Sequence, residues 1–232
     1  MISVRPAAKR GKTQTSWLDS SHTFSFNRYY DPRYMGFRDL RVINEDFVAP
    51  AQGFGTHSHN DMEILSYVVQ GALEHRDSSG GSGVLRPNEL QRMTAGTGVS
   101  HSEFNPSQTE RTHFLQIWIL PEREGLTPEY EQRSFPESER LGRLRLLAAR
   151  DGREGSVSIH QDVKLYDSLL KAGQALPYEP DPGRHAWVQM IKGAITINDL
   201  RLETSDGAAI SNETSLNIRA IEDAELLLFD LA

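Results

Sequence analysis

Cysteine is absent from the chain of 232 residues, and its absence excludes several kinds of site together. No disulfide can form, no thiolate can bind a metal, and no thiol can act as a nucleophile. The N-terminal residues, Met1-Ile2-Ser3-Val4-Arg5-Pro6, also lack the apolar stretch of a secretory signal peptide. We therefore expect a cytoplasmic protein whose reactive groups are nitrogen and oxygen atoms.

Long hydrophobic runs and basic clusters are missing as well. No segment reaches the ~18 apolar residues that a membrane-spanning helix needs. The net charge is −7 and acidic and basic residues are mixed along the chain, so no basic stripe is available to attract a nucleic acid. The group Lys9, Arg10 and Lys12 is too short to count as one. We expect neither a membrane nor a nucleic acid among the direct partners.

Two short clusters of metal-binding residue types stand out: His57-Ser58-His59 and His101-Ser102-Glu103. In a strand, residues i and i+2 point to the same face, so each cluster can aim two donors at one point. Two such strands side by side would form a cage of three imidazoles and a carboxylate. Nitrogen and oxygen donors of this kind suit iron, manganese, nickel, copper or zinc and do not choose among them.

The rest of the chain is typical of short strands separated by turn residues. Predicted strands are Leu40–Val48, Met62–Val69, Ala72–Arg76, Glu89–Thr94, His113–Leu120, Val157–His160, Ala186–Ile191, Ala194–Ile197, Ala208–Ile210, Leu216–Ala220 and Glu225–Asp230. Leucines at helical spacing predict one short amphipathic helix over Glu139–Arg150. Lys192-Gly193-Ala194 faintly repeats Gln70-Gly71-Ala72, which is consistent with a duplicated barrel.

These motifs resemble those of a known family. Residues 57–71 resemble the first cupin motif, H-x-H-x3-E-x7-G, and Gly98, His101 and Asn105 resemble the second, G-x2-H-x3-N. Trp17-Leu18-Asp19-Ser20, His22-Thr23-Phe24-Ser25-Phe26 and Gly53-Phe54-Gly55-Thr56-His57 are typical of pirins. Ile159-His160-Gln161-Asp162 and Leu227-Leu228-Phe229-Asp230 are similar to the short bacterial pirins that resemble quercetin 2,3-dioxygenases.

The resemblance implies an all-β bicupin: two antiparallel double-stranded β-barrels of jelly-roll type with a short connecting helix. We expect an N-terminal barrel with the metal site over residues 1–135, and the helix with a metal-free C-terminal barrel over residues 136–232. The C-terminal half has only His160 and His185 and no H-x-H, which favours a metal-free barrel. Two fused barrels cover much exposed sheet, so we expect a monomer.

The resemblance also implies the ligands of one divalent transition metal: His57, His59, His101 and Glu103. Iron is the first expectation, and manganese, nickel, cobalt, copper and zinc are alternatives. Ser58 stands where many relatives have proline; this residue only spaces the donors, so the change affects loop stiffness more than ligation. In other cupins the first-motif glutamate, here Glu63, is a ligand. We favour Glu103 and expect Glu63 to orient a ligand histidine.

The implied activity is O2-dependent ring opening of a flavonol such as quercetin with loss of CO. Glu103 would take the proton of the 3-hydroxyl group. A flat aromatic substrate needs an apolar pocket, for which the neighbours Phe54 and Phe104 are the first candidates and Phe26, Phe37, Met62 and Phe114 are further ones.

Two other functions remain open at the level of the sequence. A non-catalytic, redox-sensing regulator would bind a protein partner in one oxidation state of its metal. A zinc- or manganese-bound isomerase would act without O2. Phosphosugar isomerases need Lys or Arg close to the metal, whereas the candidate pocket residues here are aromatic.

Overall fold

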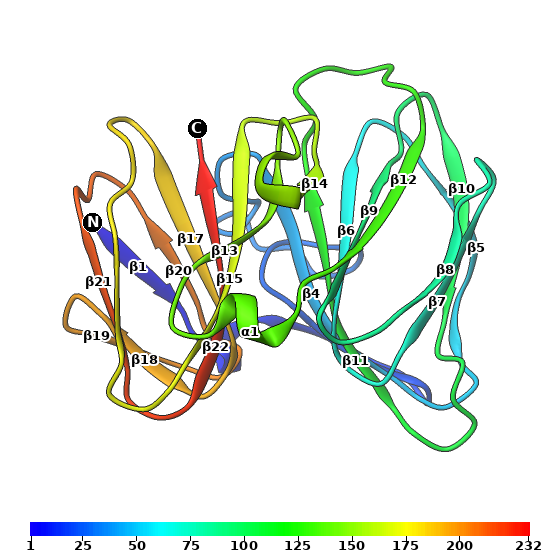
Figure 1. Cartoon of the computed structure of the whole chain (residues 1–232). Coiled ribbons are helices and arrows are strands. Elements are labelled where there is room, and N and C mark those ends of the chain that lie inside the picture. The colour runs from blue at the N-terminus through cyan, green and yellow to red at the C-terminus, as the bar shows by residue number, and fades with distance from the viewer. The chain divides into compact units, whose positions relative to one another are not determined.

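The computed structural model describes residues 1–232 and is almost entirely β-structure (Figure 1). Contacts divide the chain into two compact units. The histidine-bearing unit comprises Gly11–Ser134 and Val157–Gln161, and the C-terminal unit comprises Met1–Arg10, Phe135–Ser156 and Asp162–Ala232. Each unit therefore contains segments from both halves of the chain, whereas the ranges expected from the sequence, 1–135 and 136–232, are each continuous.

The histidine-bearing unit consists of a large and a small antiparallel sheet. The large sheet has the order β12-β9-β6-β11-β4-β3-β2, and the small sheet has the order β5-β10-β7-β8. The strands are β2 (Gly11–Gln14), β3 (Leu18–His22), β4 (Leu40–Val48), β5 (Gly53–His59), β6 (Glu63–Gln70), β7 (Leu73–Asp77), β8 (Ser82–Leu85), β9 (Glu89–Thr94), β10 (Val99–Phe104), β11 (Thr112–Ile119) and β12 (Glu129–Ser134). A two-residue strand, β14 (Val157–Ser158), lies in its second segment.

The C-terminal unit repeats this two-sheet plan. Its large sheet contains the strands β1-β20-β17-β22-β15-β13 in that order, and its small sheet has the order β16-β21-β18-β19. The strands are β1 (Ile2–Arg5), β13 (Arg145–Ala149), β15 (Val163–Leu170), β16 (Ala175–Tyr178), β17 (His185–Lys192), β18 (Ala194–Ile197), β19 (Leu200–Glu203), β20 (Gly207–Ile210), β21 (Leu216–Ala220) and β22 (Ala224–Leu231). The helical elements are α1 (Glu137–Arg140) and the 3-10 turns η1 (Ala7–Lys9) and η2 (Arg153–Gly155).

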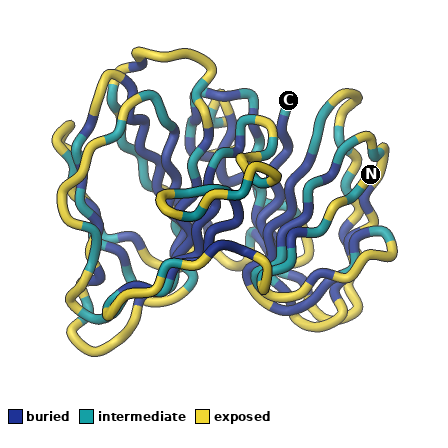
Figure 2. Tube along the Cα trace, turned by 180° about the vertical axis from the view of Figure 1, so that it is seen from behind, coloured by how far each residue is buried: buried dark blue, intermediate teal, exposed yellow.

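The interiors of the two units differ in chemistry. Most residues along the strands are buried, whereas many residues of the connecting loops are exposed (Figure 2). The C-terminal core is filled with apolar residues such as Val188, Ile195 and Leu228. The histidine-bearing unit buries many polar side chains among its apolar clusters, including Ser66, His75, Gln91, His101 and Glu103, whereas the C-terminal unit buries fewer, such as Arg140, Asp167 and Asp230. A polar interior of this kind marks the histidine-bearing unit as the place for a functional site.

The predicted strands agree closely with the observed ones. Leu40–Val48, Glu89–Thr94, Ala194–Ile197 and Leu216–Ala220 match β4, β9, β18 and β21 without a shift. The predicted strand His113–Leu120 is β11, displaced by one residue, and most of its side chains on both faces are buried. Period-two patterning and turn residues were sufficient to find these elements.

The predicted helix Glu139–Arg150 is wrong over most of its length. Helix α1 covers only Glu137–Arg140, and Gly142 adopts a left-handed φ of 67° where the chain leaves it. Arg145–Ala149 forms strand β13 and pairs with β15. Its apolar run, Leu146-Leu147-Ala148-Ala149, is buried throughout. Pairing in the sheet hides the run on both faces, which a surface helix would not do, so tertiary packing overrides the helical spacing.

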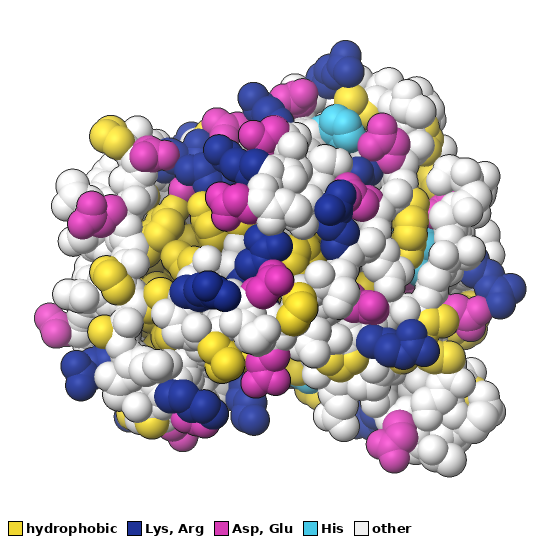
Figure 3. Space-filling model, in the orientation of Figure 1, with side chains coloured by type: hydrophobic (Ala, Val, Ile, Leu, Met, Phe, Trp, Pro, Cys, Tyr) yellow, Lys and Arg dark blue, Asp and Glu magenta, His cyan; other side chains and the backbone are white.

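No helix has the length and apolar character that a membrane-spanning segment requires. On the face drawn in Figure 3, basic and acidic side chains are interspersed.

Candidate metal centre

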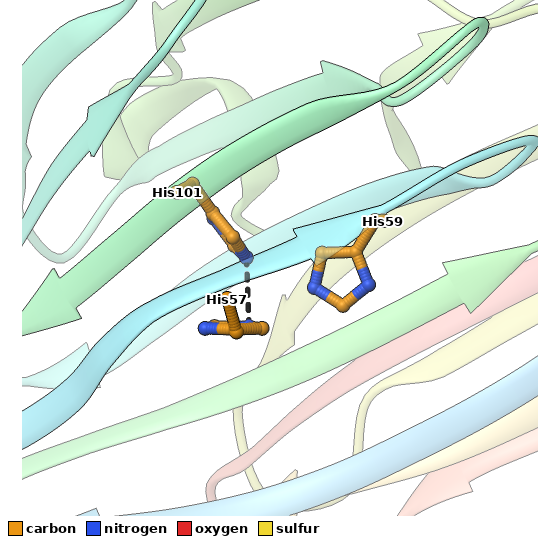
Figure 4. A group of neighbouring side chains, drawn as sticks. All are labelled: His57, His59 and His101. Carbon is orange, nitrogen blue, oxygen red and sulfur yellow. Dashed lines mark hydrogen bonds between the residues drawn. The ribbon is translucent and has the colours of Figure 1, made fainter.

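His57, His59 and His101 converge from the adjacent strands β5 and β10 (Figure 4). The strands are antiparallel, and His101 stands opposite His57 in the register. The ring centroids are 4.7 Å apart for His57 and His59, 4.4 Å for His57 and His101, and 4.9 Å for His59 and His101. The i, i+2 spacing predicted from the sequence therefore brings three imidazoles to one point.

A β-bulge shapes strand β5 next to this histidine cluster. His57 pairs with His101 and Phe54 pairs with Glu103, so β5 has one more residue than β10 between these pairs. The extra residue shifts the alternation of β5, and Phe54 joins His57 and His59 on the inner face. At the start of β5, Gly53 lies so close to β10 that a Cβ atom would be 2.2 Å from the carbonyl oxygen of Glu103. Glycine is required for this approach.

The hydrogen bonds leave two imidazole nitrogens facing each other. Nδ1 of His57 lies 2.8 Å from the carbonyl oxygen of Gly55 and donates to it, so Nε2 of neutral His57 carries a lone pair. That Nε2 lies 3.0 Å from Nε2 of His101. Two imidazole nitrogens bound at right angles to one ion, each about 2.1 Å from it, are about 3.0 Å apart. The donor pair fits a divalent metal.

Burial keeps the imidazoles of His59 and His101 in the neutral form that a metal requires. Loss of solvation, followed by the neighbouring His101 and His57, lowers the pKa of His59 from 6.5 to about 4. Loss of solvation, followed by His57 and His75, lowers the pKa of His101 to about 3. Neutral histidine is the metal-binding form, so lone pairs are available at pH 7.

Glu103 is buried, and two side chains of the large sheet hold its carboxylate. Nε2 of Gln116 donates to Oε2 at 2.7 Å, and Oγ of Ser66 lies 3.2 Å from Oε1. The ligand atoms of His57, His59 and His101 lie within 4.8 Å of one another, and Glu103 forms a second such group with His101 and His75. Glu103 thus shares His101 with the three-histidine cluster, and its role as fourth ligand stays a prediction.

A cavity of about 110 Å³ opens beside the cluster. Phe26, Phe54 and Trp118 supply aromatic wall, and His57, His59 and Glu103 also line the cavity. The rings of His59 and Trp118 are 4.9 Å apart in an edge-on contact, and the rings of Phe26 and Trp118 are 5.4 Å apart. Leu18 and several polar side chains complete the lining: Thr13, Ser20, His22, Asn27, Asn44, Asp46 and Gln116. An aromatic slot with polar groups is the form expected for a small organic ligand.

Phe104 does not line this cavity, which corrects the prediction. It follows Glu103 in strand β10 and therefore points to the opposite face. Its side chain is 38% exposed and borders a shallow depression with Glu74, Arg76 and Ser102. Phe54, the other predicted pocket residue, does line the cavity. Phe114 is a core residue, packed with Leu18 and Val48.

Glu63 also lies elsewhere than predicted. Its carboxylate is buried 3.4 Å from Nδ1 of His160, and burial raises its pKa while Thr94 and Arg92 partly offset this rise. Strand alternation explains the position. Ser66, three residues along β6, faces Glu103, so Glu63 faces the other side of the sheet. Glu63 therefore orients His160, which lies outside the histidine cluster. It does not orient any of the predicted ligand histidines.

The sequence interpretation missed His75 and Asp77, which lie behind His101. His75 is fully buried, and its Nδ1 lies 3.5 Å from Nδ1 of His101. Their i, i+2 spacing at the end of the predicted strand Ala72–Arg76 could have predicted the pair, because it places an imidazole and a carboxylate on one face. Trp118 was missed as a cavity residue because its alternation in β11 fits an ordinary core position equally well.

Comparison with known proteins shows similarity over nearly the whole chain. Residues 3–119 match the family profile described as Pirin, and residues 146–231 match the profile described as Quercetinase C-terminal cupin domain. The quercetin 2,3-dioxygenase of Escherichia coli K12 is 50% identical over 232 residues, which cover 100% of this chain and 99% of that protein. A pirin-like protein of Caulobacter vibrioides is 38% identical over 233 residues, with 100% of both chains covered.

Solved structures agree with these similarities. The crystal structure of the bacterial pirin YhhW from Escherichia coli in complex with nickel(II) has a TM-score of 0.95 and 50% identity, covering 100% of this chain and 99% of that chain. A second structure of YhhW has a TM-score of 0.97 and 49% identity, covering 100% and 98% of the two chains. The predicted all-β bicupin fold is confirmed.

Proposed function

The chain belongs to the pirin family, and we propose that it is a metal-dependent dioxygenase that opens the ring of flavonols such as quercetin with O2 and releases CO. One observation carries the proposal: two histidines of the cluster and a buried carboxylate line the same cavity as three aromatic side chains. In this proposal a flat polyphenol would enter along Phe26, Phe54 and Trp118, so that its reactive end meets His57, His59 and Glu103.

We propose that His57, His59, His101 and Glu103 hold one divalent transition metal, with iron as the first expectation and nickel supported by the complex of YhhW. A redox-active ion bound there supplies open coordination positions and an electron path between an organic substrate and O2. Burial lowers the pKa of His59 and of His101, which favours binding of a cation over protonation at these two imidazoles.

Glu103 is the proposed base. Its carboxylate borders the cavity and accepts hydrogen bonds from Gln116 and Ser66, which fix its orientation. A flavonol that enters with its 3-hydroxyl group toward the cluster places that proton next to the carboxylate. Proton transfer then needs little movement, and the hydrogen bonds to Gln116 and Ser66 hold the carboxyl group in place during the transfer.

The test is metal content and O2 uptake on one purified sample with quercetin, with CO measured in the headspace. We expect close to one metal per chain, and O2 uptake that depends on quercetin. Glu103→Gln should abolish turnover because it removes the base, and His57→Ala should lose both metal and turnover. Glu74→Gln and His113→Asn, which change residues of the same unit outside the cavity lining, should retain both.

Metal-loaded protein that leaves quercetin unchanged would remove the dioxygenase proposal. Metal bound at the same level without O2 uptake would favour the regulator hypothesis. A protein partner captured from one oxidation state alone would then support that hypothesis.

A further inference from the structure

A chain of buried side chains extends from His101 away from the cavity. Behind its ring lies His75, on the neighbouring strand β7, with the two Nδ1 atoms 3.5 Å apart. Nε2 of His75 donates to Oδ2 of Asp77 at 2.9 Å, and both side chains are completely buried. Nothing in the proposed turnover uses either residue, so their burial next to a ligand histidine needs a separate reason.

The loop after β7 fixes the carboxylate of Asp77. Oδ1 accepts three hydrogen bonds: from the backbone N–H of Ser79 at 2.8 Å, from its hydroxyl at 2.6 Å and from the N–H of Gly81 at 2.9 Å. A Cβ atom on Gly81 would lie 2.2 Å from Oδ2, so only glycine fits there. All the loop bonds go to Oδ1, and this leaves Oδ2 directed at His75.

This arrangement determines which nitrogens carry protons. Since a carboxylate only accepts hydrogen bonds, Nε2 of neutral His75 is protonated and its Nδ1 is an acceptor. Nε2 of Gln91 lies 3.2 Å from that Nδ1 and shares the acceptor with His101. Tyr130 stacks on the ring at 5.1 Å and holds its plane. His101 approaches this acceptor with Nδ1, and in its metal-binding tautomer that nitrogen carries the proton while Nε2 keeps the lone pair that faces His57.

We propose that Asp77 and His75 are positioning residues that fix the ring orientation and tautomer of His101, so that its Nε2 is directed at the proposed metal. The inference rests on the proposed ligand set, which it deepens. The hydrogen-bond partner of a ligand histidine sets its tautomer and its basicity, and losing such a partner weakens metal binding by about 10- to 100-fold.

The test compares apparent nickel(II) affinities by competition with nitrilotriacetic acid. Asp77→Asn keeps the size of the side chain, and the loop donors should still hold its Oδ1, so that an NH2 group replaces Oδ2 in front of His75. That exchange reverses the tautomer of His75 and turns a donor toward His101. We expect Asp77→Asn and His75→Leu to bind nickel about 10- to 100-fold more weakly than the wild type.

His75→Gln can still present an oxygen acceptor to His101, and we expect its affinity to stay within about threefold of the wild type. His113→Asn is the matched control, because His113 forms the other strand-borne histidine–carboxylate pair of this unit, with Glu45 at 3.0 Å. A structural readout accompanies the affinities. In zinc-loaded, nitrogen-15-labelled protein, the Nδ1 proton of His101 should exchange slowly with water in the wild type and rapidly in His75→Leu.

Unchanged nickel affinity in both Asp77→Asn and His75→Leu would overturn the inference. Equal losses in His75→Leu and His75→Gln, with slow exchange of the His101 proton in both, would also overturn it, because a packing defect would then be the cause. Failure of the proposed function looks different: the wild type would bind no nickel, or would bind it and leave quercetin intact while the affinity series still separates the variants.

Discussion

Gln116 donates to Oε2 of Glu103 at 2.7 Å, from a strand of the opposite sheet. Ser66 connects the same two side chains, since its hydroxyl lies 3.2 Å from Oε1 of Glu103 and 2.9 Å from Oε1 of Gln116. The carboxylate is thus oriented by the sheet that faces its own strand. This connection links the position of the proposed base to the packing of the two sheets.

Replacing Gln116 should therefore reduce turnover more than metal binding. Gln116→Leu removes the donor at similar volume, and we expect kcat with quercetin to fall about 10- to 100-fold while metal content stays near the wild-type value. Gln14→Leu is the control, because Gln14 is exposed and its amide lies 3.5 Å from Asp19, outside the cavity. Equal kcat values in wild type and Gln116→Leu would show that Glu103 needs no support from this amide.

Two phenylalanines near the ends of β5 and β10 provide a matched pair. Phe54 lines the cavity and Phe104 points away from it. Phe54→Ala removes ring surface that would contact a flat substrate, so we expect KM for quercetin to rise by about tenfold. Phe104→Ala should leave KM unchanged. Steady-state kinetics give KM for quercetin in both variants. A larger rise in KM for Phe104→Ala than for Phe54→Ala would contradict the placement of the cavity.

Substitution of Glu63 should leave metal content and turnover unchanged, unlike substitution of Glu103. Glu63→Gln changes a buried carboxylate beside His160, and we expect metal content and turnover to stay at wild-type levels. Stability at pH 7 should not fall, because burial raises the pKa of Glu63 and the charged carboxylate therefore costs free energy in the folded state. Urea unfolding together with metal analysis tests this. Loss of metal from Glu63→Gln at unchanged stability would return Glu63 to the list of ligands.

Tyr130 should make stability depend on pH in the alkaline range. Burial raises its pKa from 10.0 to about 12, and Asp77 and Glu89 add to the rise. The folded state therefore retains a proton that the unfolded chain releases, so this contribution is complete below pH 10 and is lost as the pH approaches 12. Tyr130→Phe should flatten the fall in unfolding free energy over that interval. Tyr30→Phe, at an exposed position, is the control, and identical pH profiles for Tyr130→Phe and wild type would refute the expectation.

The histidine cluster could be predicted because its geometry follows from local rules. Strand alternation places His57 with His59, and the antiparallel pairing of β5 with β10 brings His101 opposite His57. Alternation alone could not assign Phe54 to the inner face, because the bulge changes the phase of β5 and depends on pairing with a distant strand. His75 was missed for a similar reason, since its place behind His101 depends on the register of β7 with β10.

The helix prediction failed at residues 145–149 for a different reason. Its leucine spacing satisfies a helix, and only the partner strand β15 decides against it. Glu63 shows the limit of a motif. The spacing of the first cupin motif includes this residue, yet its strand phase directs it to the other side of the sheet from Ser66.

Strand β1 pairs with β20 in the C-terminal unit, although the two segments lie at opposite ends of the chain. During synthesis the first strand leaves the ribosome long before its partner is made, and the histidine-bearing unit waits in turn for residues 157–161. Neither unit can fold completely until a segment that is distant along the chain has been translated. Strand β1 keeps an unpaired edge until β20 has been made, and the sheet is complete only when β22 takes its place between β17 and β15.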